Sequence, residues 1–109
     1  MASQSGSEGE EPIFLDVSLP EYEAQFSVEG WCPVQAFGTV KDRDLYFRGR
    51  HDSWSFEVAD SSGVLPSDGG TGAGSFYREA RFANAGRMPK KIVIEFIRQC
   101  LSDYFASSA

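Results

Sequence analysis

The feature that most constrains the fold is a stretch of alternating apolar and polar residues over positions 34–59. Two short polar segments, at 41–44 and 51–52, divide this stretch into three runs. A period of two places alternate side chains of an extended strand on opposite faces, and short polar segments of this kind join neighbouring antiparallel strands. The stretch therefore predicts a three-stranded antiparallel meander with one apolar face and one solvent-facing side.

The lengths of the two turns predict how the three strands pair. A four-residue loop at 41–44 pairs Val40 with Leu45, and a two-residue loop at 51–52 pairs Arg50 with Ser53. We expect an aromatic ring to cover a glycine across the apolar face in this register. The predicted row on that face contains Gly38, Phe47 and Phe56.

The carboxy-terminal part of the chain has a helical pattern. Pro89 suits a first helical position, because its φ angle is already fixed near the helical value. Apolar residues after it recur at i and i+4 in two adjacent rows, which indicates a helix with one broad apolar stripe that packs across the meander. These residues are Ile92, Val93, Phe96, Ile97, Cys100, Leu101, Tyr104 and Phe105.

Three further segments alternate in the manner of strands, at 13–19, 22–28 and 76–82. Together with the meander and the helix they predict an α+β fold, in which an antiparallel sheet of four to six strands is covered on one face by the carboxy-terminal helix. With 109 residues, the chain is long enough for one core. We therefore expect a single domain over 13–109.

Two segments lack the apolar residues that would anchor them. Residues 1–12 are rich in Ser, Gly and Glu, which predicts a disordered acidic tail. Residues 60–75 are rich in Gly and Ser and predict a long, mobile loop.

The charge balance restricts the classes of partner. The chain has 16 acidic and 10 basic residues, a formal net charge of −6, which disfavours binding to phosphate backbones and to anionic membranes. No apolar run approaches the roughly 20 residues of a membrane span, and the amino terminus lacks the basic and apolar regions of a signal peptide. We expect a cytoplasmic protein that does not bind membranes.

The two cysteines, Cys32 and Cys100, are far apart in sequence and form no C-x-x-C motif. This spacing excludes a local zinc knuckle or a thioredoxin-like pair. Buried free thiols are the prediction, and a single disulfide between the two is the alternative.

Motifs that would carry catalysis are weak in this sequence. His51, Asp52 and Ser53 are the residue types of a catalytic triad, but adjacent side chains of an extended segment point to opposite faces and cannot converge. The glycines at 69–74 lack the Gly-Lys-Ser or Gly-Lys-Thr of a phosphate-binding loop, and the following segment is predicted as a strand. We therefore predict no enzymatic activity, no metal site and no cofactor.

The solvent-facing side of the meander is the candidate binding site. It combines two aromatic and two basic side chains, of types that are enriched where proteins meet. Predicted cross-strand pairs, Phe37 with Arg48 and Tyr46 with Glu57, are an alternative explanation that needs no ligand. The candidate residues are Phe37, Tyr46, Arg48 and Arg50.

Three functional hypotheses follow. The first is a small acidic, non-catalytic protein-interaction module, such as an inhibitor or accessory protein, that binds a partner protein through the exposed sheet face or the Gly-rich loop. The second is a binder of single-stranded nucleic acid, which the net charge opposes. The third is a small-ligand domain or an enzyme with a cavity between helix and sheet, lined by Trp31, Trp54, Tyr77 and Tyr104. The sequence does not determine the oligomeric state.

Overall fold

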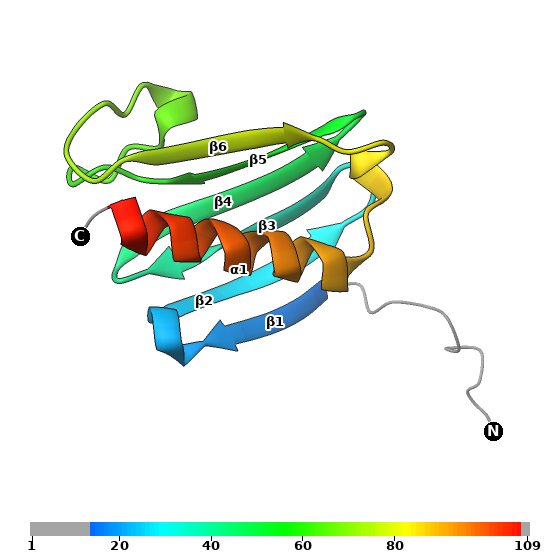
Figure 1. The fold of residues 1–109 in the computed structure, drawn as a ribbon, viewed down its shortest axis with the longest axis horizontal. Helices are drawn as coiled ribbons and strands as arrows, with labels where there is room; N and C mark the ends of the chain where they lie inside the picture. Colours follow the sequence, from blue (N-terminus) through cyan, green and yellow to red (C-terminus); the bar gives the residue numbers. More distant parts are fainter. Residues whose placement is uncertain (1–13, 108–109) are drawn as a thin grey trace.

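The computed structural model describes residues 14–107, which form a six-stranded antiparallel sheet with an α-helix on one face (Figure 1). The strands follow one another in space in their chain order, so each pairs with its neighbours in sequence. The predicted α+β fold is confirmed, with the largest number of strands expected. The predicted tail at 1–12 lies outside the described residues. The elements are β1 (Phe14–Leu19), β2 (Ala24–Gly30), β3 (Val34–Val40), β4 (Arg43–Arg50), β5 (Ser53–Val58), β6 (Phe76–Arg81) and α1 (Lys90–Ser107).

The turn between β3 and β4 is shorter than predicted. It consists of Lys41 and Asp42, whose φ angles are +48° and +67°. Positive φ at both central positions gives a two-residue turn whose twist matches that of the flanking strands. Val40 consequently pairs with Arg43, and the predicted four-residue loop is wrong. The predicted pairing of Arg50 with Ser53 is confirmed.

The shorter turn also changes the partner of Gly38. This glycine lies opposite Leu45 on one side and Phe26 on the other, while Phe47 lies opposite Ala36 and Phe56. A Cβ atom at position 38 would overlap the carbonyl oxygen of Gln25 and lie 2.6 Å from the Cβ of Phe26. Gly38 is therefore required for close packing of β2 on β3, but its aromatic neighbour is Phe26 and not the predicted Phe47.

Helix α1 covers the apolar face of the sheet. The carbonyl of Pro89 accepts hydrogen bonds from the amides of Ile92 (2.9 Å) and Val93 (3.1 Å), which places the start of the helix at the predicted proline. Phe47 is fully buried beneath the helix, whereas Phe96 is only partly buried and stacks on Trp54 at 5.0 Å. The buried apolar side chains of α1 are Val93, Ile97, Cys100, Leu101 and Tyr104.

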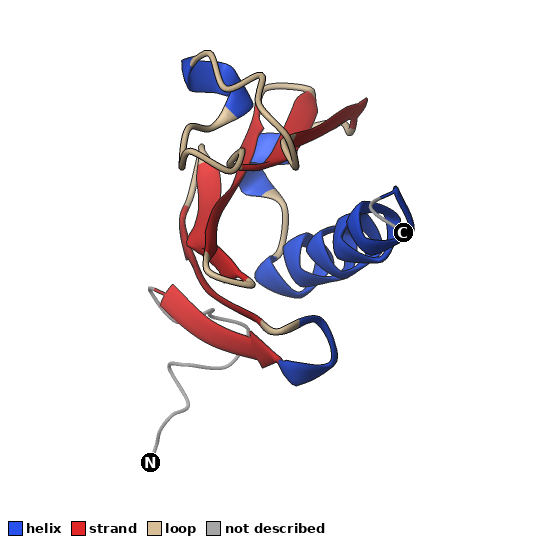
Figure 2. Ribbon diagram, turned by 90° about the vertical axis from the view of Figure 1, so that its left-hand side faces the viewer, coloured by secondary structure: helices blue, strands red, loops and turns tan. Residues whose placement is uncertain are grey.

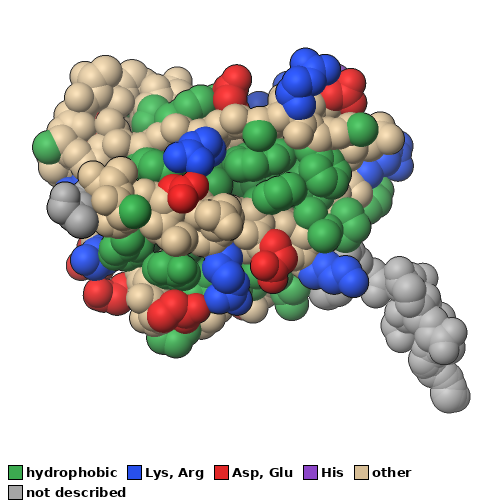
Figure 3. Space-filling model, in the orientation of Figure 1, with side chains coloured by type: hydrophobic (Ala, Val, Ile, Leu, Met, Phe, Trp, Pro, Cys, Tyr) green, Lys and Arg blue, Asp and Glu red, His purple; other side chains and the backbone are tan. Residues whose placement is uncertain are grey.

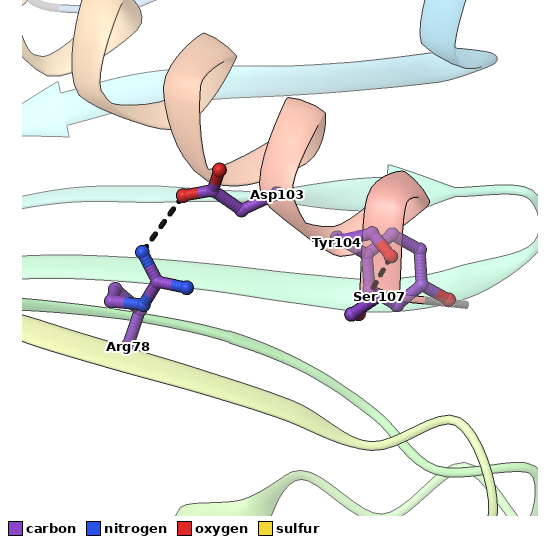
Figure 4. A network of polar contacts seen from close by, with 4 residues as sticks. All are labelled: Arg78, Asp103, Tyr104 and Ser107. Atoms are coloured by element: carbon purple, nitrogen blue, oxygen red, sulfur yellow. Dashed lines mark hydrogen bonds and ion pairs between the residues drawn. The ribbon is translucent and has the colours of Figure 1, made fainter. Parts of the chain in front are cut away.

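A salt bridge ties α1 to β6 across the open side of this layer. The Nη1 atom of Arg78 lies 2.7 Å from Oδ2 of Asp103 (Figure 4). Near the end of the helix, the Ser107 hydroxyl donates to the carbonyl of Tyr104 at 2.9 Å. Both partners of the salt bridge are partly solvated, so we expect the pair to contribute at most about 1 kcal/mol. The ring contact between Phe76 of β6 and Tyr104 of α1, with centroids 5.5 Å apart, contributes more to the attachment of the helix, and Figure 3 shows hydrophobic side chains gathered on this face of the molecule.

The connection between β5 and β6 is organised by one carboxylate and is not the unanchored loop that composition predicted. Oδ1 of Asp60 accepts hydrogen bonds from the amide and hydroxyl of Ser62 (2.9 and 2.7 Å) and from the amide of Val64 (3.0 Å). Oδ2 accepts one from the amide of Gly72 at 3.0 Å. Figure 2 shows this connection on the side of the sheet away from α1.

Both cysteines are free, which confirms the predicted thiols and excludes the disulfide. Cys100 is buried between helix and sheet, and burial raises the pKa of its thiol to about 12. Cys32 is exposed, so the prediction of a buried thiol is wrong at this position. Within residues 14–107, no helix is long and apolar enough to cross a membrane.

Candidate functional site

The four predicted site residues all lie on the outer sheet face, which is the face turned away from α1. Phe37 lies on β3, and Tyr46, Arg48 and Arg50 lie on β4. The alternation of burial along both strands places them on this face, because their sequence neighbours Ala36, Leu45, Phe47 and Gly49 are buried on the other.

Phe37 and Tyr46 lie directly opposite each other, and their ring centroids are 5.1 Å apart. The predicted pairing of Phe37 with Arg48 is wrong, because the shorter turn shifts the register by two residues and places Arg48 opposite Gln35. The Tyr46 hydroxyl donates to Oε1 of Gln35 at 2.7 Å, and burial raises the pKa of that hydroxyl. The side chain of Phe37 remains 44% exposed to solvent, although its ring packs against that of Tyr46.

Glu57 lies opposite Tyr46, as predicted, but it does not face solvent. Only 2% of its surface is exposed, and its carboxylate accepts hydrogen bonds from the amide and the hydroxyl of Ser67, both at 2.8 Å. Ser67 belongs to the short 3-10 helix Pro66–Asp68 of the Gly-rich segment. This segment therefore covers one end of the outer sheet face. Its Ser67 binds the Glu57 carboxylate, for which the sequence predicted an interaction with Tyr46.

A cavity of about 230 Å³ opens on the outer sheet face over β4, β5 and β6. Its middle strand carries the short side chains of Ser53 and Ser55, which pair with Arg50 and Arg48 of β4. On the other side, Ser55 pairs with Glu79 of β6. Short side chains between two rows of long ones form a trough. Its lining residues are Arg48, Arg50, His51, Ser53, Trp54, Ser55, Tyr77 and Glu79.

The arginines of this cavity have no carboxylate partner among residues 14–107. Within the described part of the chain, neither Arg48 nor Arg50 forms an ion pair. The Nε atom of Arg48 is buried and has no hydrogen-bond partner among residues 14–107. A buried donor without an acceptor costs about 1–3 kcal/mol, so an acceptor that reached this atom would recover that free energy.

The carboxylate of Glu79 is already engaged. The Tyr77 hydroxyl donates to Oε1 of Glu79 at 2.5 Å, and this hydrogen bond is the main reason that the pKa of Tyr77 is raised. Glu79 therefore faces its own strand neighbour, and the two arginines across the trough remain available.

Sequence reasoning did not assign Tyr77 and Glu79 to the site. The alternation over 76–82 predicted a strand, and the structure confirms it as β6. That pattern places Tyr77 and Glu79 on one face, but it does not say that this strand joins the sheet beside β5. Phe14 was also missed; it is an exposed aromatic residue on the same face, at the other edge of the sheet.

The structure does not bring together the four residues predicted to line a small-ligand cavity between helix and sheet. Trp54 and Tyr104 are buried on the helix side, where Trp54 stacks on Phe47. Tyr77 lies on the outer sheet face, and Trp31 is exposed after β2. These four side chains therefore do not meet between helix and sheet, because β-strand alternation places Tyr77 on the opposite face of the sheet from Trp54.

The chemistry available at the cavity is recognition by hydrogen bonds and charge. His51 is exposed at the β4–β5 turn, and the carboxylate of Asp52 accepts a hydrogen bond from the amide of Asn84 at 3.2 Å. Residues 14–107 contain no group of three His, Cys, Asp or Glu side chains placed to hold a metal ion.

Comparisons of the chain with protein families, with curated proteins and with solved structures find no match.

Proposed function

We propose that this chain is a non-catalytic protein-interaction module that binds a partner protein through the outer sheet face. The observation that carries the proposal is the buried Nε of Arg48, which has no hydrogen-bond partner among residues 14–107 and belongs to a residue that lines a cavity together with Arg50. Buried polar groups in folded proteins almost always have hydrogen-bond partners, so an orphan donor at a surface cavity favours an acceptor from outside the chain.

The exposed aromatic side chains beside the cavity support a protein partner. Phe37 and Tyr77 are 44% and 47% exposed on the same face as the two arginines. Aromatic residues and arginine are enriched at protein interfaces, where large contact areas combine with hydrogen bonding. The net charge of −6 favours a partner whose surface is basic overall, with acidic groups opposite the arginines.

Affinity capture from a lysate of the source organism tests this function. We expect the double variant Phe37→Ser, Arg50→Ser to lose the captured partner while its stability changes by only about 1 kcal/mol, since exposed cross-strand contacts contribute little to folding. The matched control is Trp31→Ser, Arg87→Ser, which removes one exposed aromatic residue and one exposed arginine away from the outer sheet face.

Equal capture by the double variant and the parent chain would contradict the proposal. A mobility shift of single-stranded oligonucleotides that weakens steeply with salt would instead assign the face to nucleic acid. Loss of capture by the control alone would place the interaction on the other side of the molecule.

A further inference from the structure

We infer that the cavity over Ser53 and Ser55 binds a carboxylate group of the partner, an inference that rests on the proposed function. The donors come from two neighbouring strands. Arg48 and Arg50 stand on β4, and the hydroxyls of the two serines form the floor on β5. A guanidinium group presents its N–H donors in a planar fork that matches the two oxygens of a carboxylate.

The positions of the arginines favour an anion between them. Arg48 and Arg50 lie two residues apart on one strand, so their side chains leave the same face about 7 Å apart. These two like charges repel each other, and a bound anion would relieve that repulsion.

The charge of the lining favours a carboxylate over a phosphate. Two arginines against one glutamate leave a net charge of +1 when His51 is neutral. A carboxylate carries a single negative charge and neutralises this lining, whereas a phosphate monoester brings nearly two. The second charge of a phosphate would meet Glu79 across the trough, where like charges are unfavourable.

The test is an NMR titration of the full ¹⁵N-labelled chain, with the side-chain Nε–H signal of Arg48 as readout. N-acetylglutamate α-amide offers only a side-chain carboxylate, and N-acetylalanine offers only a terminal one. N-acetylglutamine α-amide is the neutral control, and inorganic phosphate is the competing anion. We expect a saturable shift with one or both carboxylates, none with the glutamine compound and weaker binding of phosphate. The tighter of the two carboxylates identifies which part of a partner chain the cavity accepts.

Two variants sharpen the result. Arg48→Lys removes the planar fork but keeps the charge, and we expect it to weaken carboxylate binding about tenfold. Glu79→Gln removes the opposing charge while keeping an acceptor for Tyr77, and we expect it to strengthen phosphate binding most. Because Glu79 is exposed, this second variant tests the inference even where Arg48→Lys does not fold. Arg87→Lys is the control, and it should bind as the parent chain does.

Three outcomes would overturn the inference: no saturable shift, equal shifts with the glutamine compound, or tighter binding of phosphate than of either carboxylate in the parent chain. The titration needs no partner, so it fails independently of the proposed function. Capture that depends on Phe37 and Arg50 without carboxylate binding would overturn only the inference. Carboxylate binding with unchanged capture by the double variant would overturn only the proposed function.

Discussion

At the scale of single residues, Asp60 shows how one side chain can order a Gly-rich segment. It is only 4% exposed, and its two oxygens accept four hydrogen bonds from Ser62, Val64 and Gly72. These bonds favour the ionised carboxylate, and the hydroxyl of Ser62 is the largest cause of a pKa well below the usual range of aspartate. The folded state therefore prefers the charged form more than the unfolded state does.

This preference predicts a pH-dependent effect of Asp60→Asn. The contribution of the ionised carboxylate is fully present above the unfolded pKa of about 4 and is lost as the pH falls through the lower folded pKa. We expect the variant to be less stable than the parent at neutral pH, and the difference in urea midpoint to shrink as the pH is lowered from about 7 to about 3. Asp16→Asn, at an exposed position of β1, is the matched control. A difference that stays constant across this range would show that the charge of Asp60 is not the cause.

The residue scale also marks a limit of sequence reasoning. Alternation correctly placed Phe37, Tyr46, Arg48 and Arg50 on one face, because the period of a strand is fixed by its geometry. The partners of Glu57 and Asp60 could not be predicted, since Ser and Gly supply donors at many positions and composition does not say which of them turn toward a carboxylate.

At the scale of elements, the β3–β4 turn decides which side chains of the outer sheet face meet. Polar composition at 41–44 suggested a four-residue loop, whereas the structure closes the turn with Lys41 and Asp42. Neither residue belongs to the Asn-Gly type that normally signals a two-residue turn, so local sequence gave no indication of it. The register of β4 with β5 was predictable, because the His51–Asp52 turn leaves no alternative of similar length.

The short helix Pro66–Asp68 predicts an effect at this scale. Ser67→Ala removes the hydroxyl donor to Glu57, so that among residues 14–107 only the Ser67 amide still donates to a carboxylate that is almost fully buried. We expect a loss of about 1–2 kcal/mol in the free energy of unfolding, because hydrogen bonds to buried charged groups contribute more than neutral ones. Denaturant unfolding measures the effect, and Ser61→Ala, at an exposed position of the same connection, should change it by less than about 0.5 kcal/mol. Equal losses in the two variants would mean that Ser67 does not anchor the segment.

At the scale of the whole molecule, the fold was predictable because every strand pairs with a sequence neighbour. A meander requires only short turns and an alternation of apolar and polar residues along each strand. Helix α1 is predicted by the apolar stripe in its sequence. The cavity was harder to predict, because it requires β6 to return beside β5 after the long Gly-rich connection. The proposed binding surface therefore depends on the least local pairing in the sheet.

The thiol of Cys100 reports on how the helix and sheet separate. It is buried on α1, and burial raises its pKa to about 12, so both access and the thiolate form are suppressed in the folded chain. Helix α1 also buries Val93, Ile97 and Leu101 against the sheet, so its release would expose most of the core. We expect Cys32 to react at once with a thiol reagent, and Cys100 in the Cys32→Ser variant to react only through global unfolding. The free energy obtained from its labelling rate should therefore equal that from urea unfolding. A clearly smaller value from labelling would show that α1 leaves the sheet while the strands stay paired, and the sheet would then be the more stable part of the molecule.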